Sequence, residues 1–166
     1  LLPLGLQAAK VDTLQVKSPS MNKSIEVVVV SPDVAATKAC PVIYLLHGYG
    51  GNARTWVGIK PDLPKIADEK GIFFVCPDGK NTWYWDSPLN ADVRYETFIS
   101  NELVKYVDSH YKTVADRKGR AITGLSMGGH GAMWNGLRHS DVFSAAGSTS
   151  GGVDIRPFPK NWEMSV

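Results

Sequence analysis

The chain has 166 residues, of which 43% are apolar and 20% are charged, and its formal net charge is +2. That length and composition predict one globular domain with a hydrophobic core of its own. The nearly balanced charge gives no electrostatic reason to expect nucleic acid or an anionic membrane surface as a partner. No run approaches the roughly 18 to 20 apolar residues of a membrane span, so no membrane-spanning segment is expected.

The first nine residues, LLPLGLQAA, resemble the end of a secretory signal. A short apolar run leads to Ala8 and Ala9, and a charged residue follows, as in the region around a signal cleavage site. We therefore expect residues 1–9 to be a signal-peptide remnant and the protein to be exported, either periplasmic or secreted. A flexible apolar tail or a first strand, in a cytoplasmic protein, is the alternative.

Hydrophobic patterns along the rest of the chain predict alternating strands and helices after an opening hairpin-like pair. Apolar runs bounded by turn residues predict strands at 25–30, 42–46, 72–76, 120–124 and 142–148. Three- and four-residue spacing predicts helices at 56–70, interrupted near Pro61 and Pro64, and at 92–111 and 126–138. Residues 81–90, NTWYWDSPLN, are too rich in turn residues for either element.

This alternation predicts the α/β class, with a mostly parallel sheet covered by helices on both faces. The chain shows no repeat, low-complexity tract or linker, so residues 10–166 are expected to belong to one domain.

Cys40 and Cys76 are predicted to be free thiols. Cys40 precedes the strand at 42–46, and Cys76 ends the strand at 72–76. If these strands are parallel, about five residues, or about 16 Å, separate the two cysteines. A disulfide needs Cα atoms within about 7 Å. The four histidines and two cysteines show no ligand spacing, so neither a metal site nor a cofactor is expected.

The run Gly124-Leu125-Ser126-Met127-Gly128 fits G-x-S-x-G, directly after a predicted strand and before a predicted helix. In that context the motif marks a sharp strand-to-helix turn that exposes a nucleophilic serine at the carboxyl edge of the sheet. The flanking glycines are expected because the turn brings the two backbones too close for a Cβ atom. Ser126 is therefore the predicted nucleophile.

A second glycine-rich turn, His47-Gly48-Tyr49-Gly50-Gly51-Asn52, follows the strand at 42–46. Hydrolases of this kind keep one oxyanion-hole donor in the corresponding loop, and the other is the amide of the residue after the nucleophile. We expect the backbone N–H groups of Tyr49 and Met127 to be these donors. Gly50 is the next candidate in the loop and is expected near the substrate.

The motifs LLHGYGGN, YETFISNEL and GLSMGGHGA resemble those of the esterase family of α/β-hydrolases. The family includes tributyrin esterases, S-formylglutathione hydrolases, feruloyl and acetyl xylan esterases, and mycolyltransferases. The resemblance covers most of residues 25–152 and implies an α/β-hydrolase fold. It also implies Ser126 as the nucleophile and the amides of Tyr49 and Met127 as the oxyanion hole.

The partners of Ser126 are not evident, because the family places its acid and histidine after the nucleophile and no histidine follows His139. His130 lies one helical turn beyond Ser126 and is expected on the helix flank. His47 is expected to shape the oxyanion loop, and Asp154 to be a surface residue. We expect the chain to be the N-terminal part of a C-terminally truncated hydrolase domain, and these 166 residues to be inactive by themselves because the acid and histidine are missing. The alternative is a degenerate member that binds carbohydrate without catalysis.

The predicted function is a serine carboxylic-ester hydrolase that forms an acyl-enzyme on Ser126, with small acyl or carbohydrate-linked (acetyl or feruloyl) esters as substrates. An acyltransferase using the same serine is an alternative. Export favours carbohydrate-linked esters. Trp83, Tyr84 and Trp85 follow a strand at the active edge and are expected to line the substrate pocket. The other reading is that one or two of them close the core beneath the loop.

Overall fold

The structure is a computed structural model that describes residues 9–154. Its strands are β1 (Lys10–Ser18), β2 (Lys23–Ser31), β3 (Val42–Leu46), β4 (Phe73–Pro77), β5 (Arg120–Gly124) and β6 (Ala145–Ala146). Its α-helices are α1 (Thr55–Ile59), α2 (Leu63–Lys70), α3 (Tyr95–Thr97), α4 (Val104–His110) and α5 (Met127–Arg138). A π-helical stretch, η2 (Phe98–Leu103), joins α3 to α4, and 3-10 turns occupy η1 (Asp33–Ala36) and η3 (Arg117–Gly119).

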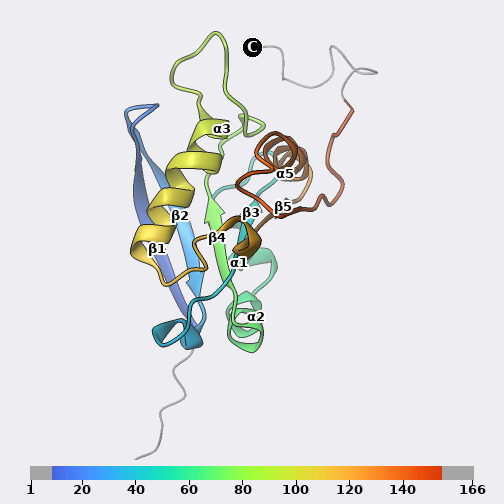
Figure 1. The fold of residues 1–166 in the computed structure, drawn as a ribbon. Helices are drawn as coiled ribbons and strands as arrows, with labels where there is room; N and C mark the ends of the chain where they lie inside the picture. Colours follow the sequence, from blue (N-terminus) through green and yellow to red (C-terminus); the bar gives the residue numbers. More distant parts are fainter. Residues whose placement is uncertain (1–8, 155–166) are drawn as a thin grey trace, which may run out of the picture.

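The strands form one sheet in the order β1-β2-β4-β3-β5-β6 (Figure 1). The strands β4, β3, β5 and β6 run parallel to one another, whereas β1 and β2 form an antiparallel pair at one edge and β2 is also antiparallel to β4. The mostly parallel α/β architecture predicted from the alternating pattern is therefore confirmed. The opening pair is β1 with β2, and the sequence patterns alone gave no bounds for β1.

Helices cover both faces of the sheet (Figure 1). Helices α1 and α2 pack on the face that carries Val28, Val30 and Leu45. The continuous helical segment α3–η2–α4 and helix α5 pack on the other face, around Tyr44, Val75 and other core residues. In parallel sheets covered in this way, the loops beyond the carboxyl ends of the strands form the functional edge.

Most elements lie within one or two residues of their predicted bounds, but two differ in a way that has a clear local cause. The helix expected at 92–111 begins at Tyr95, because residues 91–94 are a turn whose Val93 N–H donates to the Asn90 carbonyl. The strand expected at 142–148 is reduced to Ala145–Ala146. Its first residues form a turn instead, since the amides of Val142 and Phe143 both donate to the carbonyl of His139.

Cys40 and Cys76 are both free and buried, in agreement with the prediction from strand register. Helices α1 and α2 are separate, as Pro61 and Pro64 suggested, and α2 ends at Gly71 in the left-handed conformation. Within residues 9–154, no helix is long and apolar enough to cross a membrane. The predicted signal remnant, except for Ala9, and residues 155–166 of the predicted domain lie outside the described residues.

Candidate active site

Ser126 lies on the turn between β5 and α5, with φ 52° and ψ −117°. Residues other than glycine rarely adopt a positive φ. Such a backbone persists only where the surrounding structure holds it. Here the Ser126 N–H donates to the Thr149 carbonyl at 2.8 Å, and the Gly128 N–H donates to the Leu125 carbonyl at 2.8 Å. This is the strained strand-to-helix turn expected for a G-x-S-x-G segment.

The flanking glycines permit a close approach of backbone segments. A Cβ atom on Gly128 would lie 2.1 Å from the carbonyl oxygen of Leu46. A Cβ atom on Gly124 would lie 2.4 Å from the carbonyl carbon of Gly128. Neither distance is compatible with a side chain, because the obstructing atoms are backbone and have little freedom to move. The expectation that glycine is needed on both sides of the turn is therefore confirmed.

The glycine-rich loop after β3 lies beside Ser126. Leu46 is paired with Gly124 in the β3–β5 register, so the two turns leave the same edge of the sheet. A Cβ atom on Gly48 would lie 3.5 Å from the Cβ atom of Ser126. Met127 is the first residue of α5, and amides in the first turn of a helix have no intrahelical acceptor. Both predicted oxyanion-hole segments therefore flank the serine.

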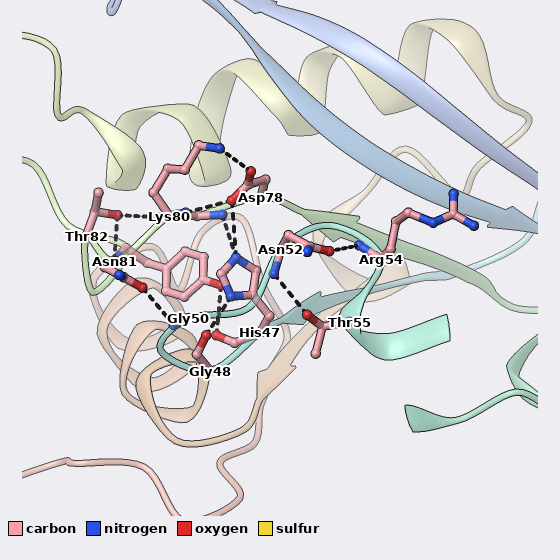
Figure 2. A network of polar contacts seen from close by, with 12 residues as sticks. His47, Gly48, Gly50, Asn52, Arg54, Thr55, Asp78, Lys80, Asn81 and Thr82 are labelled. Carbon is pink, nitrogen blue, oxygen red and sulfur yellow. Dashed lines mark hydrogen bonds and ion pairs between the residues drawn. The ribbon is translucent and has the colours of Figure 1, made fainter. Parts of the chain in front are cut away.

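Gly50 has φ 75°, which glycine adopts at little cost. Its N–H donates to Oδ1 of Asn81 at 2.8 Å, so this amide is already engaged (Figure 2). Asn81 belongs to the loop after β4, and the amide of Gly50 thus ties two loops of the active edge together. The amide of Gly50 therefore anchors its loop. The expectation that Gly50 is the next candidate for an oxyanion-hole donor is wrong, because its N–H is already engaged.

His47 is fully buried and links the glycine-rich loop to the end of β4 (Figure 2). The N–H of Gly79 donates to His47 Nε2 at 2.9 Å, and His47 Nδ1 lies 2.7 Å from the carbonyl oxygen of Gly48. Because Nε2 accepts a hydrogen bond, Nδ1 carries the ring proton and donates it to Gly48. His47 thus holds the carbonyl of Gly48, which lies beside Ser126 in space. This agrees with the expectation that His47 shapes the oxyanion loop.

Asp78 directly precedes Gly79 and is 5% exposed. Its Oδ2 pairs with Lys80 Nζ at 2.7 Å, and its Oδ1 accepts the Lys80 N–H at 2.8 Å. Burial would raise the pKa of Asp78, but the ion pair and hydrogen bonds with Lys80 outweigh it and hold that pKa below its usual range. Asp78 is therefore ionised at neutral pH and fixes the turn that carries Asn81.

The aromatic stretch after β4 packs inward. Trp83 is 4% exposed and Tyr84 is fully buried, and both have a positive φ. The Tyr84 hydroxyl donates to the His47 carbonyl at 2.9 Å, and Asn135 Nδ2 donates to the Tyr84 carbonyl at 3.0 Å. The expectation that Tyr84 lines a substrate pocket is therefore wrong. Its ring packs between the glycine-rich loop and α5. This agrees with the alternative that one or two of the three aromatic residues close the core beneath the loop.

Trp83 also belongs to the core, and Trp85 is half-buried. Both rings contact the His130 ring edge to face, at centroid distances of 5.3 Å and 5.6 Å. His130 Nδ1 lies 2.7 Å from the carbonyl oxygen of Gly152, and burial lowers the His130 pKa. His130 thus lies on the flank of α5, as expected, within an aromatic cluster. Trp85 alone of the three aromatic residues keeps an exposed part that could contact a ligand.

Within residues 9–154, no histidine or carboxylate is hydrogen-bonded to the Ser126 hydroxyl. Asp154 is exposed, as predicted for a surface residue. His139, at the C-terminal end of α5, lies 2.8 Å from Oε1 of Glu96. The described residues also contain no group of three His, Cys, Asp or Glu side chains that could hold a metal ion.

Asn81 and Asp78 were missed by the sequence reasoning. Neither belongs to a recognised motif, and both lie in the segment after β4, whereas the glycine-rich loop follows β3. A usable signal was present, because both follow β4 at the same edge of the sheet as the loop after β3.

Comparisons with known proteins identify the family of the chain. The family model described as "Putative esterase" matches residues 18–164. Esterase Rv1288 of Mycobacterium tuberculosis (strain ATCC 25618 / H37Rv) is 30% identical over 86% of this chain and 32% of its own length. The acetyl esterase of Caldicellulosiruptor saccharolyticus is 32% identical over 61% of this chain and 37% of its own length.

Among solved structures, a ferulic acid esterase matches with a TM-score of 0.71 and 32% identity, over 84% of this chain and 61% of that one. The chain spans between about one third and two thirds of the length of these proteins. The sheet, the strained serine turn and the family match agree, and the chain belongs to the esterase family of α/β-hydrolase-fold proteins.

Proposed function

We propose that Ser126 is the nucleophile of a carboxylic-ester hydrolase. The observation that carries this proposal is its backbone at φ 52° on a strand-to-helix turn, with Gly48 directly beside it. The serine oxygen attacks the ester carbonyl carbon and its proton passes to a general base. The acyl group then stays on Ser126 while the alcohol leaves with a proton. Water afterwards releases the acid and restores the serine.

The tetrahedral intermediate carries a negative oxygen, which two backbone amides would stabilise. Met127, at the start of α5, and Tyr49, next to Gly48, are the proposed donors. Loss of one such donor typically costs about 3 to 4 kcal/mol of transition-state stabilisation. The supports from His47 and Asn81 keep this loop in place, because each holds a backbone group adjacent to Tyr49.

The proposed substrates are small acyl esters or acetyl and feruloyl esters linked to carbohydrate. The names of the acetyl esterase and ferulic acid esterase relatives support this class. The signal-like residues 1–9 support action outside the cytosol, where such polymers occur. Trp85, half-buried beside His130, is the proposed aromatic contact with substrate.

The test is an intact-mass measurement after incubation with a fluorophosphonate, paired with hydrolysis of p-nitrophenyl acetate and methyl ferulate. One adduct, mapped to Ser126 and absent in Ser126→Ala, is the expected result. Ser109→Ala is the matched control, because Ser109 is an exposed serine on α4. The assay is made on a chain long enough to include the acid and histidine that the family places after the nucleophile. Ester hydrolysis that persists in Ser126→Ala, or a folded protein of that length that neither labels nor hydrolyses, would overturn the proposal.

A further inference from the structure

A polar cavity of about 360 Å³ opens at the active edge, on the β1–β2 side of the glycine-rich loop. The antiparallel pair contributes Gln15, Ser24 and Glu26, and the segment after the glycine-rich loop contributes Asn52 and Arg54. Ligand pockets span about 300 to 1,000 Å³, so this one has room for one or two sugar rings. None of its lining residues belongs to the proposed oxyanion hole.

Several polar groups lining this cavity have unused hydrogen-bonding capacity. Among the described residues, the Glu26 carboxylate takes part in no hydrogen bond or ion pair. Arg54 uses one terminal nitrogen, which donates to the Thr13 hydroxyl at 3.0 Å. The Asn52 side chain accepts the Arg54 N–H through Oδ1, which leaves its Nδ2 donor unused. The cavity therefore presents both acceptors and donors to a ligand.

The charges that line the cavity are balanced. Glu26 and Asp78 are acidic, whereas Arg54 and Lys80 are basic. Asp78 and Lys80 already pair with each other at 2.7 Å. Neither a phosphate nor a metal ion would find an excess of opposite charge here. A neutral molecule with many hydroxyl groups fits, because each hydroxyl both donates and accepts a hydrogen bond.

The cavity adjoins the active site through continuous loops (Figure 2). Asn52 lies four residues after Gly48, and Lys80 directly precedes Asn81, whose side chain anchors Gly50. Figure 2 shows Asn52, Arg54 and Asp78 on the side of His47 that faces the β1–β2 pair, with Gly50 and Asn81 on the other side. A ligand in the cavity would therefore lie along the same edge as a substrate on Ser126.

We propose that this cavity is a subsite for a neutral sugar residue, bound by Glu26, Asn52 and Arg54. That the sugar belongs to the alcohol part of the ester rests on the proposed function. Binding of a free sugar does not depend on the proposed function, because no residue that lines the cavity takes part in the reaction at Ser126.

The test is a titration of the ¹⁵N-labelled protein with xylobiose, a neutral disaccharide, followed by backbone amide shifts. We expect saturable shifts at Asn52, Arg54 and Glu26, unchanged in Ser126→Ala. Loss of a hydrogen bond to a charged group should weaken binding about tenfold in Glu26→Ala and in Arg54→Ala. Glu69→Gln is the matched control, because it removes a charge from an exposed position on α2, outside the cavity.

Absence of saturable shifts at these residues, or affinity unaffected by both Glu26→Ala and Arg54→Ala, would overturn the subsite. A parallel titration with inorganic phosphate should give no saturable shift there, and saturation by phosphate would contradict a site for neutral ligands. Because Ser126→Ala is expected to bind xylobiose normally, failure of ester hydrolysis and failure of this subsite give different results.

Discussion

Ser126, Trp83 and Tyr84 all hold a positive φ, although none of them is glycine. Hydrogen bonds with other segments hold the strained backbone of Ser126 and Tyr84 in place. The Ser126 amide donates to Thr149, while Tyr84 donates to His47 and accepts from Asn135. Strain of this kind tends to occur where function requires a fixed geometry. Here the strained residues of two separate loops meet around the glycine-rich segment.

Tyr84→Phe is expected to destabilise the protein by about 1 kcal/mol, because it removes the hydrogen bond to the buried His47 carbonyl. Tyr44→Phe is the matched control. The Tyr44 hydroxyl is buried and has no hydrogen-bond partner among the described residues, so its removal should be neutral or stabilising. Urea denaturation of both variants measures the difference. Equal losses of unfolding free energy would contradict the assigned contacts.

Gly128→Ala should cost about 1 to 3 kcal/mol or more, because the new Cβ would overlap the Leu46 carbonyl oxygen at 2.1 Å. Gly58→Ala tests the same substitution where there is space, since nothing lies within 4 Å of a Cβ atom at that position of α1. There we expect a gain of about 0.5 to 1 kcal/mol. Thermal denaturation should therefore move the two melting temperatures in opposite directions. A Gly128→Ala protein as stable as the parent would refute the close approach.

Helix α3 is joined to the end of α5 by one carboxylate. Glu96 accepts from Trp134 Nε1 at 2.7 Å and from Arg138 Nε at 2.8 Å, and it contacts His139 Nε2 at 2.8 Å. Burial would raise the Glu96 pKa, but the hydrogen bonds from these three residues outweigh it and lower the pKa from its ordinary value. These contacts fix the C-terminal end of α5. The N-terminal end of the same helix begins at Met127, directly after Ser126.

The Glu96 network should make stability depend on pH. Because its pKa is lower in the folded than in the unfolded state, its contribution is complete above the ordinary value of 4.5 and is lost as the pH falls through the folded pKa. Glu96→Gln should cost about 2 to 3 kcal/mol at pH 7 and much less at pH 3. Guanidinium denaturation at both pH values measures this. Exposed Glu69→Gln should change little at either, and a loss in Glu96→Gln that is independent of pH would argue against the network.

At the scale of the whole molecule, the sheet separates the two cysteines. Cys40 precedes β3, whereas Cys76 lies near the end of the neighbouring parallel strand β4. Both thiols are buried, and burial raises the pKa of each. Reactive thiols are exposed and largely ionised, so both residues should be inert in the folded state.

Neither thiol is expected to react with 5,5′-dithiobis(2-nitrobenzoate) in native buffer, and two per chain should react in guanidinium chloride. Slow labelling of the native protein should then follow global unfolding, because both side chains lie in the core. Absorbance at 412 nm counts the released thiolates. Fast reaction of either thiol without denaturant would contradict its burial, and fewer than two in denaturant would reveal a disulfide.

The sequence by itself determined the alternating α/β order, the strained serine turn, the neighbouring glycine-rich loop and the two free thiols. Each of these depends on local periodicity, turn chemistry or strand register, which short segments encode. Only the tertiary structure decided that Tyr84 points inward, that Glu96 meets His139, and that Asp78 and Asn81 support the loop after β3. It also decided that β1 and β2 form one wall of the polar cavity that contains Glu26, Asn52 and Arg54. The reason is that these contacts join residues far apart in the chain, and their partners are chosen by packing between elements.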